Sequence, residues 1–509
     1  MEPIVPPAVA EEIVKQKSVI VIGAGIGGIT AATHLARRGL KVNVLEKNSR
    51  PGGRCDRFER EGHTFDTGPT LLVMPLLYEA EFSALGANAS MQEMLDLQRV
   101  DPTYHLVFDD GSKLALTSDM KSLQEQLERF EPGSFQGLLR YMDEGHRHYH
   151  LGIEKLVNRD FRSAADFFKF EHLPLLYQLK PLANHYRNMS AYFDDPRLKA
   201  AFTFQDVYMG LSPFEAPATF SMMPYTELAH GVWYPRGGMY SIVETLMELA
   251  RAAGVEFEFN ASVEQIDVNG TQAQGVVLTD GRRLRADAVL ANADLPYVYN
   301  KLLPLDGESG RLARKRFSCS VISFFWGVDK PVPQLPPHTL FLAEDYRENF
   351  DSIIRDLDLP DNPSLYVHAP ARLDSAMAPE GQDTVIAIVP VGHMSENGEQ
   401  DWAAIRDRAR RHVFRRLKTL GITDLEEHLK FEVNFTPLSW RKRYNLVKGS
   451  THGLCHNLTQ LGYFRPRNRH ARYPNLYFVG ASTHPGTGVP TAMVSGRLAA
   501  ERILDDFRM

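Results

Sequence analysis

The hydrophobic pattern near the N-terminus predicts a strand, a helix and a second strand. Residues 18–22 are mostly apolar and β-branched, which is typical of a buried strand. A glycine-rich turn follows, then a helical apolar pattern that ends near Gly39, and then a second apolar run that ends at Glu46. This order predicts one βαβ unit, the building block of a parallel sheet covered by helices.

Similar patterns return twice later in the chain. Residues 233–300 predict a glycine turn, an amphipathic helix, a short strand pair, a hairpin and a buried strand. The segment from Asn475 predicts another strand, a glycine-containing loop and a helix. Between these returns, residues 73–225 predict mostly helices, and residues 300–470 predict strands and helices without a phosphate loop. We therefore expect an α/β protein whose two domains are interwoven along the chain.

The expected division of the chain into domains follows from these recurring α/β segments. One domain is expected to be Rossmann-like and to bind a dinucleotide, a second to be mixed α+β and to contact substrate, and a helical region is a candidate for substrate or membrane binding. The expected boundaries are 18–115, 226–300 and 471–509 for the nucleotide-binding domain, 116–225 for the helical region and 301–470 for the substrate domain.

Composition narrows the classes of function. The 57 basic and 63 acidic residues nearly balance, so no basic field favours nucleic acid as a partner. Cys55, Cys319 and Cys455 are far apart and form no CxxC pair, which favours inert thiols over a disulfide framework or a thiolate metal site. The first residues carry acids and prolines, so we expect no signal peptide, and no segment is a convincing transmembrane helix. We expect a protein on the cytoplasmic side that is peripherally associated with a membrane surface.

The turn of the first βαβ unit carries a nucleotide signature. Gly23, Gly25 and Gly28 fill the G-x-G-x-x-G pattern, which permits a tight turn, backbone approach to a pyrophosphate and close packing of helix on strand. The free N–H groups at the helix start favour the phosphates. Glu46 ends the second strand, where a carboxylate accepts hydrogen bonds from ribose hydroxyls and repels a 2′-phosphate. A dinucleotide other than NADP is predicted; this unit leaves NAD and FAD open.

A second glycine pair follows in "RPGGRCDRF", and Arg54 comes directly after it. A permanently charged, bidentate donor at this place suits a diphosphate. "GHTFDTGPTLL" comes next, with turn residues at Gly68 and Pro69. From these motifs the chain resembles the flavin amine oxidase and carotenoid desaturase superfamily, in which a GG-R segment lies on the FAD pyrophosphate.

Three histidines in "EGHRHYHLGIEK" raise the question of a metal site. His146 and His150 share a helix face, but no further ligand set completes a tetrahedral zinc site, so we expect no metal and favour a polar helix face or a tunnel lining for His146, His148 and His150. His150 and Glu154 remain candidate proton acceptors, and no catalytic residue is otherwise assigned. No GxSxG elbow or P-loop is present, so the chemistry is expected to belong to the cofactor.

Several further stretches resemble the bacterial and fungal type of phytoene desaturase. The more specific ones are "YPRGG", "HAPARLDSAMAPEG" and "GASTHPGTGVP"; "YMGLSPFEAPATF" and "CSVISFFWG" are most similar to the fungal branch. The resemblance runs from about residue 18 to 505. It implies an FAD enzyme that desaturates phytoene stepwise toward lycopene, by hydride transfer to flavin and loss of the neighbouring proton to a base or water.

The resemblance also implies a set of cofactor contacts. Val263 would lie on the strand that meets the adenine, and the loop "GASTHPGTGVP" would face the flavin ring, with the start of the following helix directed at the ring's pyrimidine edge. His484 in this loop is expected to be a hydrogen-bonding pin rather than an acid or base. The implied contacts are Gly23, Gly25, Gly27, Gly28, Glu46, Lys47, Gly53, Arg54, Gly68, Pro69, Thr70, Val263, Asn292, Asp294, Gly480, Gly488 and Val489.

Partners and alternatives complete the prediction. The substrate has no polar group, so we expect a long apolar tunnel to bind it. We expect quinone or oxygen to reoxidise the FAD, because no second nucleotide motif is present. Residues 165–190 mix aromatic and aliphatic side chains with cations, a pattern that suits either a membrane interface or an ordinary helix pair. The alternatives are a 3,4-desaturase, a diapocarotenoid desaturase, a carotenoid isomerase, an amine oxidase, or a binding protein similar to the GDP-dissociation inhibitors of prenylated GTPases.

Overall fold

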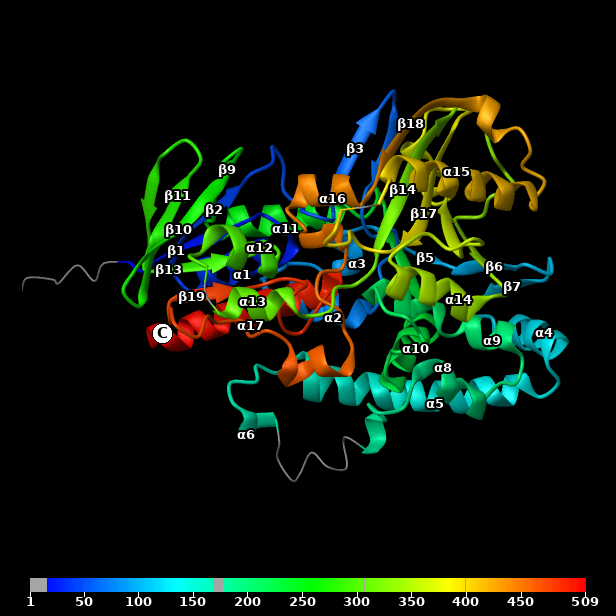
Figure 1. Cartoon of the computed structure of the whole chain (residues 1–509), viewed down its shortest axis with the longest axis horizontal. Helices are drawn as coiled ribbons and strands as arrows, with labels where there is room; N and C mark the ends of the chain where they lie inside the picture. The colour runs from blue at the N-terminus through cyan, green and yellow to red at the C-terminus, as the bar shows by residue number, and fades with distance from the viewer. Residues whose placement is uncertain (1–15, 168–176, 306, 399) are drawn as a thin grey trace, which may run out of the picture.

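The computed structural model describes residues 16–167, 177–305, 307–398 and 400–509 (Figure 1). Two sheets and a helical layer divide this part of the chain. One sheet, with its covering helices, contains the N-terminal glycine loop and the C-terminal helix. The other sheet lies beside it, and the helices of the middle of the chain lie across one side of both (Figure 1).

The first sheet has five parallel strands in the order β19-β13-β1-β2-β9. Its central strand β1 is buried on both faces, as expected of the apolar run that forms it. Three distant segments of the chain supply the strands, so the interwoven α/β fold with a Rossmann-like sheet is confirmed. The strands are β1 (Ser18–Ile22), β2 (Lys41–Glu46), β9 (Glu256–Phe259), β13 (Ala288–Ala291) and β19 (Leu476–Phe478).

Helices cover one face of this sheet and a small antiparallel sheet covers the other. α1 (Ile26–Arg37), α11 (Ser241–Ala252) and α17 (Val489–Phe507) share a buried apolar core with Val19, Val42 and Leu290. On the opposite face Ile20 and Val289 pack with apolar side chains of the sheet β10-β11-β12. Its strands are β10 (Val263–Asn269), β11 (Gln272–Leu278) and β12 (Arg283–Arg285).

The second sheet has seven strands in the order β18-β14-β17-β16-β15-β6-β7, and every pairing except β15 with β6 is antiparallel. α15 (Trp402–Lys418) packs on one face through a core that includes Trp326 and Val413. The strands are β6 (Tyr104–Phe108), β7 (Lys113–Leu116), β14 (Ser320–Val328), β15 (His338–Leu342), β16 (Leu365–His368), β17 (Asp383–Val391) and β18 (Leu429–Phe435).

The pairing of β6 and β7 differs from the expected division of the chain. β6 and all but the last residue of β7 lie within 18–115, which the sequence assigned to the nucleotide-binding domain, yet β6 pairs with β15 in the second sheet. An apolar strand pattern shows that a segment is buried in a sheet but does not say which sheet it joins. The first crossing between the domains therefore comes before residue 104.

The middle of the chain is helical, as predicted. α5 (Ser134–Gly152) packs closely on α10 (Met222–Ala229), because a Cβ atom on Gly145 would lie 2.6 Å from Cβ of Tyr225. The other helical segments here are α4 (Met120–Phe130), η1 (Ile153–Val157), α6 (Ala164–Phe167), α8 (His185–Asn188), η3 (Met189–Ala191), α9 (Pro196–Ala201), η4 (Phe204–Met209) and η5 (Ala218–Ser221). Of the segment 165–190, residues 168–176 lie outside the described residues. Throughout the described ranges, every helix is too short or too polar to cross a bilayer.

Short elements connect these layers. Two antiparallel pairs of short strands are β3 (Arg57–Arg60) with β4 (His63–Asp66), and β5 (Leu97–Val100) with β8 (Val232–Pro235). The remaining helices are α2 (Pro75–Ala84), α3 (Met91–Met94), α12 (Leu295–Tyr297), η6 (Val298–Leu302), α13 (Gly307–Ala313), α14 (Tyr346–Asp351), η7 (Ser352–Asp356), η8 (Pro370–Arg372), η9 (Ser375–Met377), η10 (Leu425–His428), α16 (Pro437–Tyr444), η11 (Val447–Gly449), η12 (Leu458–Gln460) and η13 (Gly462–Phe464).

The close contact between α1 and α17 generates a prediction about stability. A Cβ atom on Gly496 would lie 2.7 Å from the Gly27 carbonyl oxygen and 3.0 Å from the Ala31 nitrogen. Both are backbone atoms, which can move apart only at a cost in free energy. We expect Gly496→Ala to lower the free energy of unfolding by about 1–3 kcal/mol through overpacking. The matched control is Gly310→Ala in α13, where a Cβ would meet nothing within 4 Å. There, helix propensity predicts a gain of up to about 1 kcal/mol. Denaturant unfolding measures the free energy of unfolding of both variants. Equal changes in the two variants would contradict the prediction.

Candidate functional site

The N-terminal glycine loop packs so closely on its neighbours that side chains would not fit at its glycine positions. A Cβ atom on Gly28 would lie 2.2 Å from the Gly23 carbonyl oxygen, and one on Gly27 would lie 2.9 Å from Cγ2 of Val479. Asn292, at the end of β13, donates from Nδ2 to the Gly23 carbonyl at 3.1 Å. The loop is thus fixed from below by β13 and α17, and its N–H groups at the start of α1 remain directed at the space above.

Glu46 lies beside this loop at the end of β2. It is 6% exposed, and its carboxylate accepts from the Ala24 N–H at 2.8 Å and the Asn48 N–H at 2.9 Å. Burial raises its pKa, and these two hydrogen bonds oppose that shift. Lys47 donates to Oδ1 of Asn445 at 2.9 Å, so its ammonium group points toward the second domain. The carboxylate is therefore fixed at the strand end, at one edge of the cavity described below.

The GG-R segment passes directly over the glycine loop. Gly25 and Gly52 pair in an isolated parallel bridge, and a Cβ atom on Gly68 would lie 1.9 Å from the Arg54 carbonyl oxygen. Arg54 donates from Nη1 to the Thr451 carbonyl at 2.7 Å. Burial lowers the pKa of Arg54 and nearby Asp294 opposes the shift. A cation is thus placed at the glycine loop by backbone contacts that no larger residue at position 68 would allow.

The C-terminal loop closes the other side of the site. Gly488, with φ +117°, precedes α17, and Pro490 occupies the first turn of that helix. His456 accepts at Nε2 from the Thr487 N–H at 3.0 Å. Ser482 donates to Oδ1 of Asp294 at 2.8 Å, and burial raises the pKa of Asp294. The loop is therefore held on one side by Asp294, which follows β13, and on the other by His456.

Arg465 fixes the shape of this loop and was not predicted from the sequence. Its side chain is 2% exposed, and desolvation lowers its pKa to about 9. Its guanidinium donates only to backbone carbonyl oxygens, those of Leu454, Cys455, Gln460, Ala481 and Thr483. His484, 5% exposed, packs its ring edge-to-face on Phe161 at 5.5 Å. A buried arginine of this kind has no sequence signature, because its partners are carbonyl groups that every residue carries.

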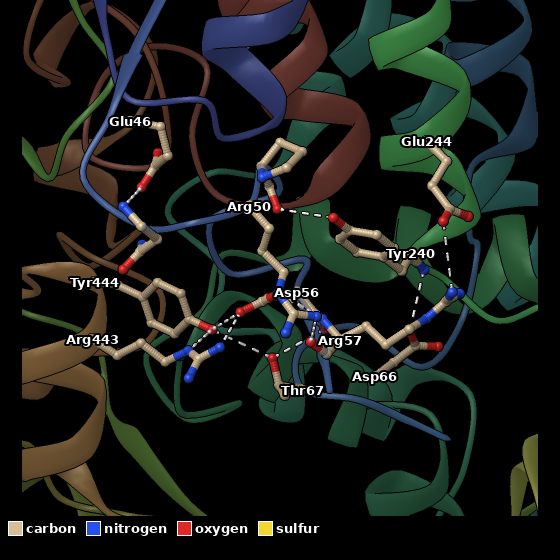
Figure 2. Close-up of polar contacts among 12 residues, drawn as sticks. Glu46, Arg50, Asp56, Arg57, Asp66, Thr67, Tyr240, Glu244, Arg443 and Tyr444 are labelled. Carbon is tan, nitrogen blue, oxygen red and sulfur yellow. Dashed lines mark hydrogen bonds and ion pairs between the residues drawn. The ribbon is translucent and has the colours of Figure 1, made fainter. Parts of the chain in front are cut away.

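A network of charged side chains joins the two domains beside the site (Figure 2). Asp56, 5% exposed, forms an ion pair with Arg443 and accepts from the Tyr444 hydroxyl at 3.2 Å, both at the end of α16. Asp66 accepts from the Met239 N–H at 2.6 Å, and burial raises its pKa to about 6. Figure 2 shows Arg443 and Tyr444 pointing at Asp56 from the opposite side to Arg57. Sequence reasoning missed this network because its members lie almost four hundred residues apart.

One cavity of about 530 Å³ runs from the glycine loop into the second domain. Of the residues predicted to contact cofactor, all but Gly28 line it, and Gly28 packs on the Gly23 carbonyl instead. Beyond them the wall is mainly apolar, from η1, η4, α10, α14 and the strands of the second sheet. Representative lining residues are Ile153, Val157, Phe204, Met222, Met223, Leu340, Leu342, Tyr346, Phe350 and Ile388.

The two candidate proton acceptors lie elsewhere. Glu154 is exposed and forms an ion pair with Lys155, and His150 is exposed on α5. Neither lines the cavity, although Ile153 on the next turn does. His148 is buried and bonds Ser221 and the Gln178 carbonyl, and His146 bonds the Tyr225 hydroxyl at 2.8 Å. Helical spacing alone could not say which face of α5 meets the cavity. Among the residues with described positions, no three potential ligands gather as a metal site would require.

The cradle fits a flavin dinucleotide. Backbone N–H groups, a fixed carboxylate and an arginine lie along one end of the cavity, beside glycines whose missing side chains let the loop pack on Asn292 and on the Gly23 carbonyl. The family model for flavin-containing amine oxidoreductases matches residues 26–504. A solved structure of a putrescine oxidase variant aligns with a TM-score of 0.64 at 16% identity, over 96% of this chain and 99% of that one, which supports the same fold.

Sequence comparison points to one branch of this family. A phytoene desaturase of Fusarium fujikuroi is 40% identical, over 96% of this chain and 90% of that protein. A zeta-carotene-forming phytoene desaturase of Myxococcus xanthus is 41% identical, over 96% of this chain and 94% of that protein. A 4,4'-diapophytoene desaturase of Staphylococcus haemolyticus is more distant, at 34% identity over 96% of this chain and 99% of that protein. The chain therefore belongs to the flavin-containing amine oxidoreductase family, as an FAD-dependent oxidoreductase of the phytoene desaturase type.

Proposed function

We propose that this protein desaturates phytoene stepwise toward lycopene. The observation that carries the proposal is the continuity of one cavity, polar at the glycine loop and mainly apolar over the rest of its length. A polyene without polar groups can be held only by such a wall, through apolar contact and shape. FAD supplies the oxidation, because its ring accepts a hydride with both electrons.

The site residues are assigned to parts of FAD as follows. We propose that Glu46 and Val263 contact the adenosine part, and that the glycine loop with Arg54 contacts the pyrophosphate. The segment Gly68–Thr70 and the start of α17 would flank the ring. Gly488 and Val489 would then direct the N-terminal dipole of α17 at the ring, where negative charge builds on reduction. The remaining proposed contacts are Gly23, Gly25, Gly27, Gly28, Lys47, Gly53, Pro69, Asn292, Asp294 and Gly480.

Electron transfer away from FAD is assigned to quinone or molecular oxygen. A lipid-soluble quinone has the same apolar character as the cavity wall, so it suits the same entrance as the substrate. Reoxidation after anaerobic reduction, followed with a quinone and with oxygen in turn, distinguishes the two acceptors.

A membrane surface is the proposed source of the substrate. Tyr177 is 85% exposed and Leu182 is 87% exposed, and both lie close in sequence to α6 at one edge of the molecule (Figure 1). Lys180 lies between them in sequence, and its ammonium group forms an ion pair with the buried carboxylate of Glu144. The cavity reaches Ile153 and Val157 of η1, the segment that precedes α6. An apolar substrate leaving the bilayer at this edge would therefore have a short path to the cavity.

The membrane proposal predicts the effect of two charges. We expect the double variant Tyr177→Glu and Leu182→Glu to abolish flotation with vesicles of anionic phospholipid, because both side chains lose apolar burial and gain charge repulsion. FAD content should stay unchanged. Leu305→Glu is the matched control, since Leu305 is 77% exposed outside this region. Equal flotation of the double variant and the wild type would contradict the proposal.

The assignment of Glu46 predicts weaker cofactor binding in Glu46→Gln. The amide keeps the shape but loses the charge that accepts from Ala24 and Asn48 and, in the proposal, from ribose. Hydrogen bonds to a charged group are worth about 1.5–3 kcal/mol, so FAD affinity should fall roughly ten- to hundredfold. Titration of apoprotein with FAD, followed by flavin fluorescence, measures this. Glu256→Gln on the neighbouring strand β9, where Glu256 is exposed, should leave the affinity unchanged.

The substrate itself is tested by product analysis. In cells that make phytoene but lack a desaturase, expression of this protein should convert phytoene to lycopene, read by absorbance and chromatography. Unchanged phytoene would overturn the proposal. Conversion of lycopene to 3,4-desaturated products, or turnover of 4,4'-diapophytoene in preference to phytoene, would favour another carotenoid desaturase. A protein that stays colourless after FAD is added would favour the binding-protein alternative.

A further inference from the structure

A polar patch interrupts the apolar wall of the cavity next to Thr70. The hydroxyls of Tyr104 on β6 and Tyr208 on η4 are hydrogen-bonded to each other. Tyr366 on β16 bonds Oγ1 of Thr70 at 2.8 Å and Nδ1 of His338 at 2.7 Å. The three tyrosines and Thr70 line the cavity. Since Thr70 follows the Gly68-Pro69 turn assigned to the flavin ring, the patch lies where the cofactor part of the cavity meets its apolar part.

A buried carboxyl group lies close to Tyr208 without lining the cavity itself. Glu227 on α10 is 4% exposed, and its Oε2 accepts from Nε2 of Gln205 at 3.0 Å. Its Oε1 has no hydrogen-bond partner within the part of the chain that the structure describes. Burial raises the pKa of Glu227 to about 7, and the side chains of Gln205 and Tyr208 oppose the shift. A buried carboxyl with one oxygen that no protein group bonds in this way is a candidate for a functional role.

Among the titratable side chains near this wall, Glu227 is the one suited to accept a proton. Tyr104 and Tyr208, and Tyr141 on α5, have pKa values raised well above the usual range by burial and, in part, by the Glu227 charge, so they stay protonated. Burial, together with His368 and His105, lowers the pKa of His338 well below its usual range, so that imidazole binds a proton poorly. Near neutral pH, Glu227 alone among these groups changes its protonation state readily.

We propose that Glu227, acting through the Tyr208 hydroxyl, takes up the proton that the substrate loses in each desaturation. The inference rests on the proposed function. One substrate carbon gives up hydrogen as hydride to FAD, which is the oxidant. The adjacent C–H bond then breaks, its electron pair forms the new double bond, and its proton passes to the Tyr208 oxygen while Tyr208 gives its own proton to the Glu227 carboxylate. Glu227 ends as the neutral acid and Tyr208 is unchanged. Tyr208 is the group that faces substrate, and Glu227 is the positioning residue behind it.

The test compares Glu227→Gln and Tyr208→Phe with the wild type as purified, FAD-loaded protein on phytoene-containing vesicles. Anaerobic reduction of FAD in a single turnover is recorded from pH 5.5 to pH 9, a range chosen to bracket the pKa of about 7. The wild-type rate should rise about tenfold per pH unit below that pKa and level off above it, because only the carboxylate accepts a proton. Each variant should be about 100-fold slower or more, without this rise, and with KM little changed.

A control and a second readout separate this role from a structural one. Glu144→Gln on α5 replaces another carboxyl that is 1% exposed, bonded to Asn188 and Lys180 away from the cavity, and it should keep the wild-type pH profile. Infrared difference spectra of the FAD-free protein should show a protonated carboxyl that titrates near pH 7 and disappears in Glu227→Gln.

The outcomes are distinct. If the wild type reduces its FAD with phytoene and Glu227→Gln does so at the same rate and pH profile, the inference is overturned and the proposed function stands. A carboxyl band that titrates in the ordinary range of glutamate also overturns it. A wild type that cannot oxidise phytoene at any pH overturns the proposed function and this inference together.

Discussion

The contact of the Gly23–Gly28 loop with Asn292 and α17 is the constraint on which the site depends. Strand β1 can meet helix α1 so tightly only because position 28 carries no side chain, and α17 can lie on α1 only because position 496 carries none. The hydrogen bond from Asn292 to the Gly23 carbonyl adds β13 to the same point. Residues separated by almost the whole chain thus meet at the phosphate end of the cavity, and the nucleotide-binding domain exists only when all three segments have come together.

Electrostatics at this site rests on fixed backbone groups more than on side-chain ion pairs. Arg465 donates to five carbonyl groups, and Glu46 and Asp294 accept from backbone N–H groups, so each charge is held in one place with little freedom to rearrange. Such preorganised groups in a poorly solvated site stabilise charge that develops during a reaction more effectively than mobile side chains do. The ion pair of Asp56 with Arg443 has another role, because it ties the second domain to the first beside the cavity.

Much of the cradle was predictable because its chemistry depends on local spacing. The glycine triplet, the acid at the end of β2 and the GG-R segment each occupy a short stretch, and the physical reason for each residue can be stated without the fold. All the predicted contacts except Gly28 line one cavity, whereas their roles toward FAD remain a proposal. The pairing of β6 with β15, the carbonyl ligands of Arg465 and the burial of Glu227 depend on contacts between distant segments. The periodicity of a sequence does not show which distant segments come into contact. It therefore could not show that His150 and Glu154 lie on a helix face turned away from the cavity.

The shape of the cavity explains why an apolar substrate and a charged cofactor can share it. The end of the cavity at the glycine loop is lined by backbone N–H groups, a carboxylate and an arginine, and the other end mainly by apolar side chains. A substrate without polar groups gains nothing from the first and is driven into the second by burial of its surface. The tyrosines and Thr70 at the boundary are polar groups in an otherwise mainly apolar part of the wall, and burial raises the pKa of each of these tyrosines. Under the proposed function, a mainly apolar wall with this polar boundary would place proton transfer where the ring of FAD and the substrate meet.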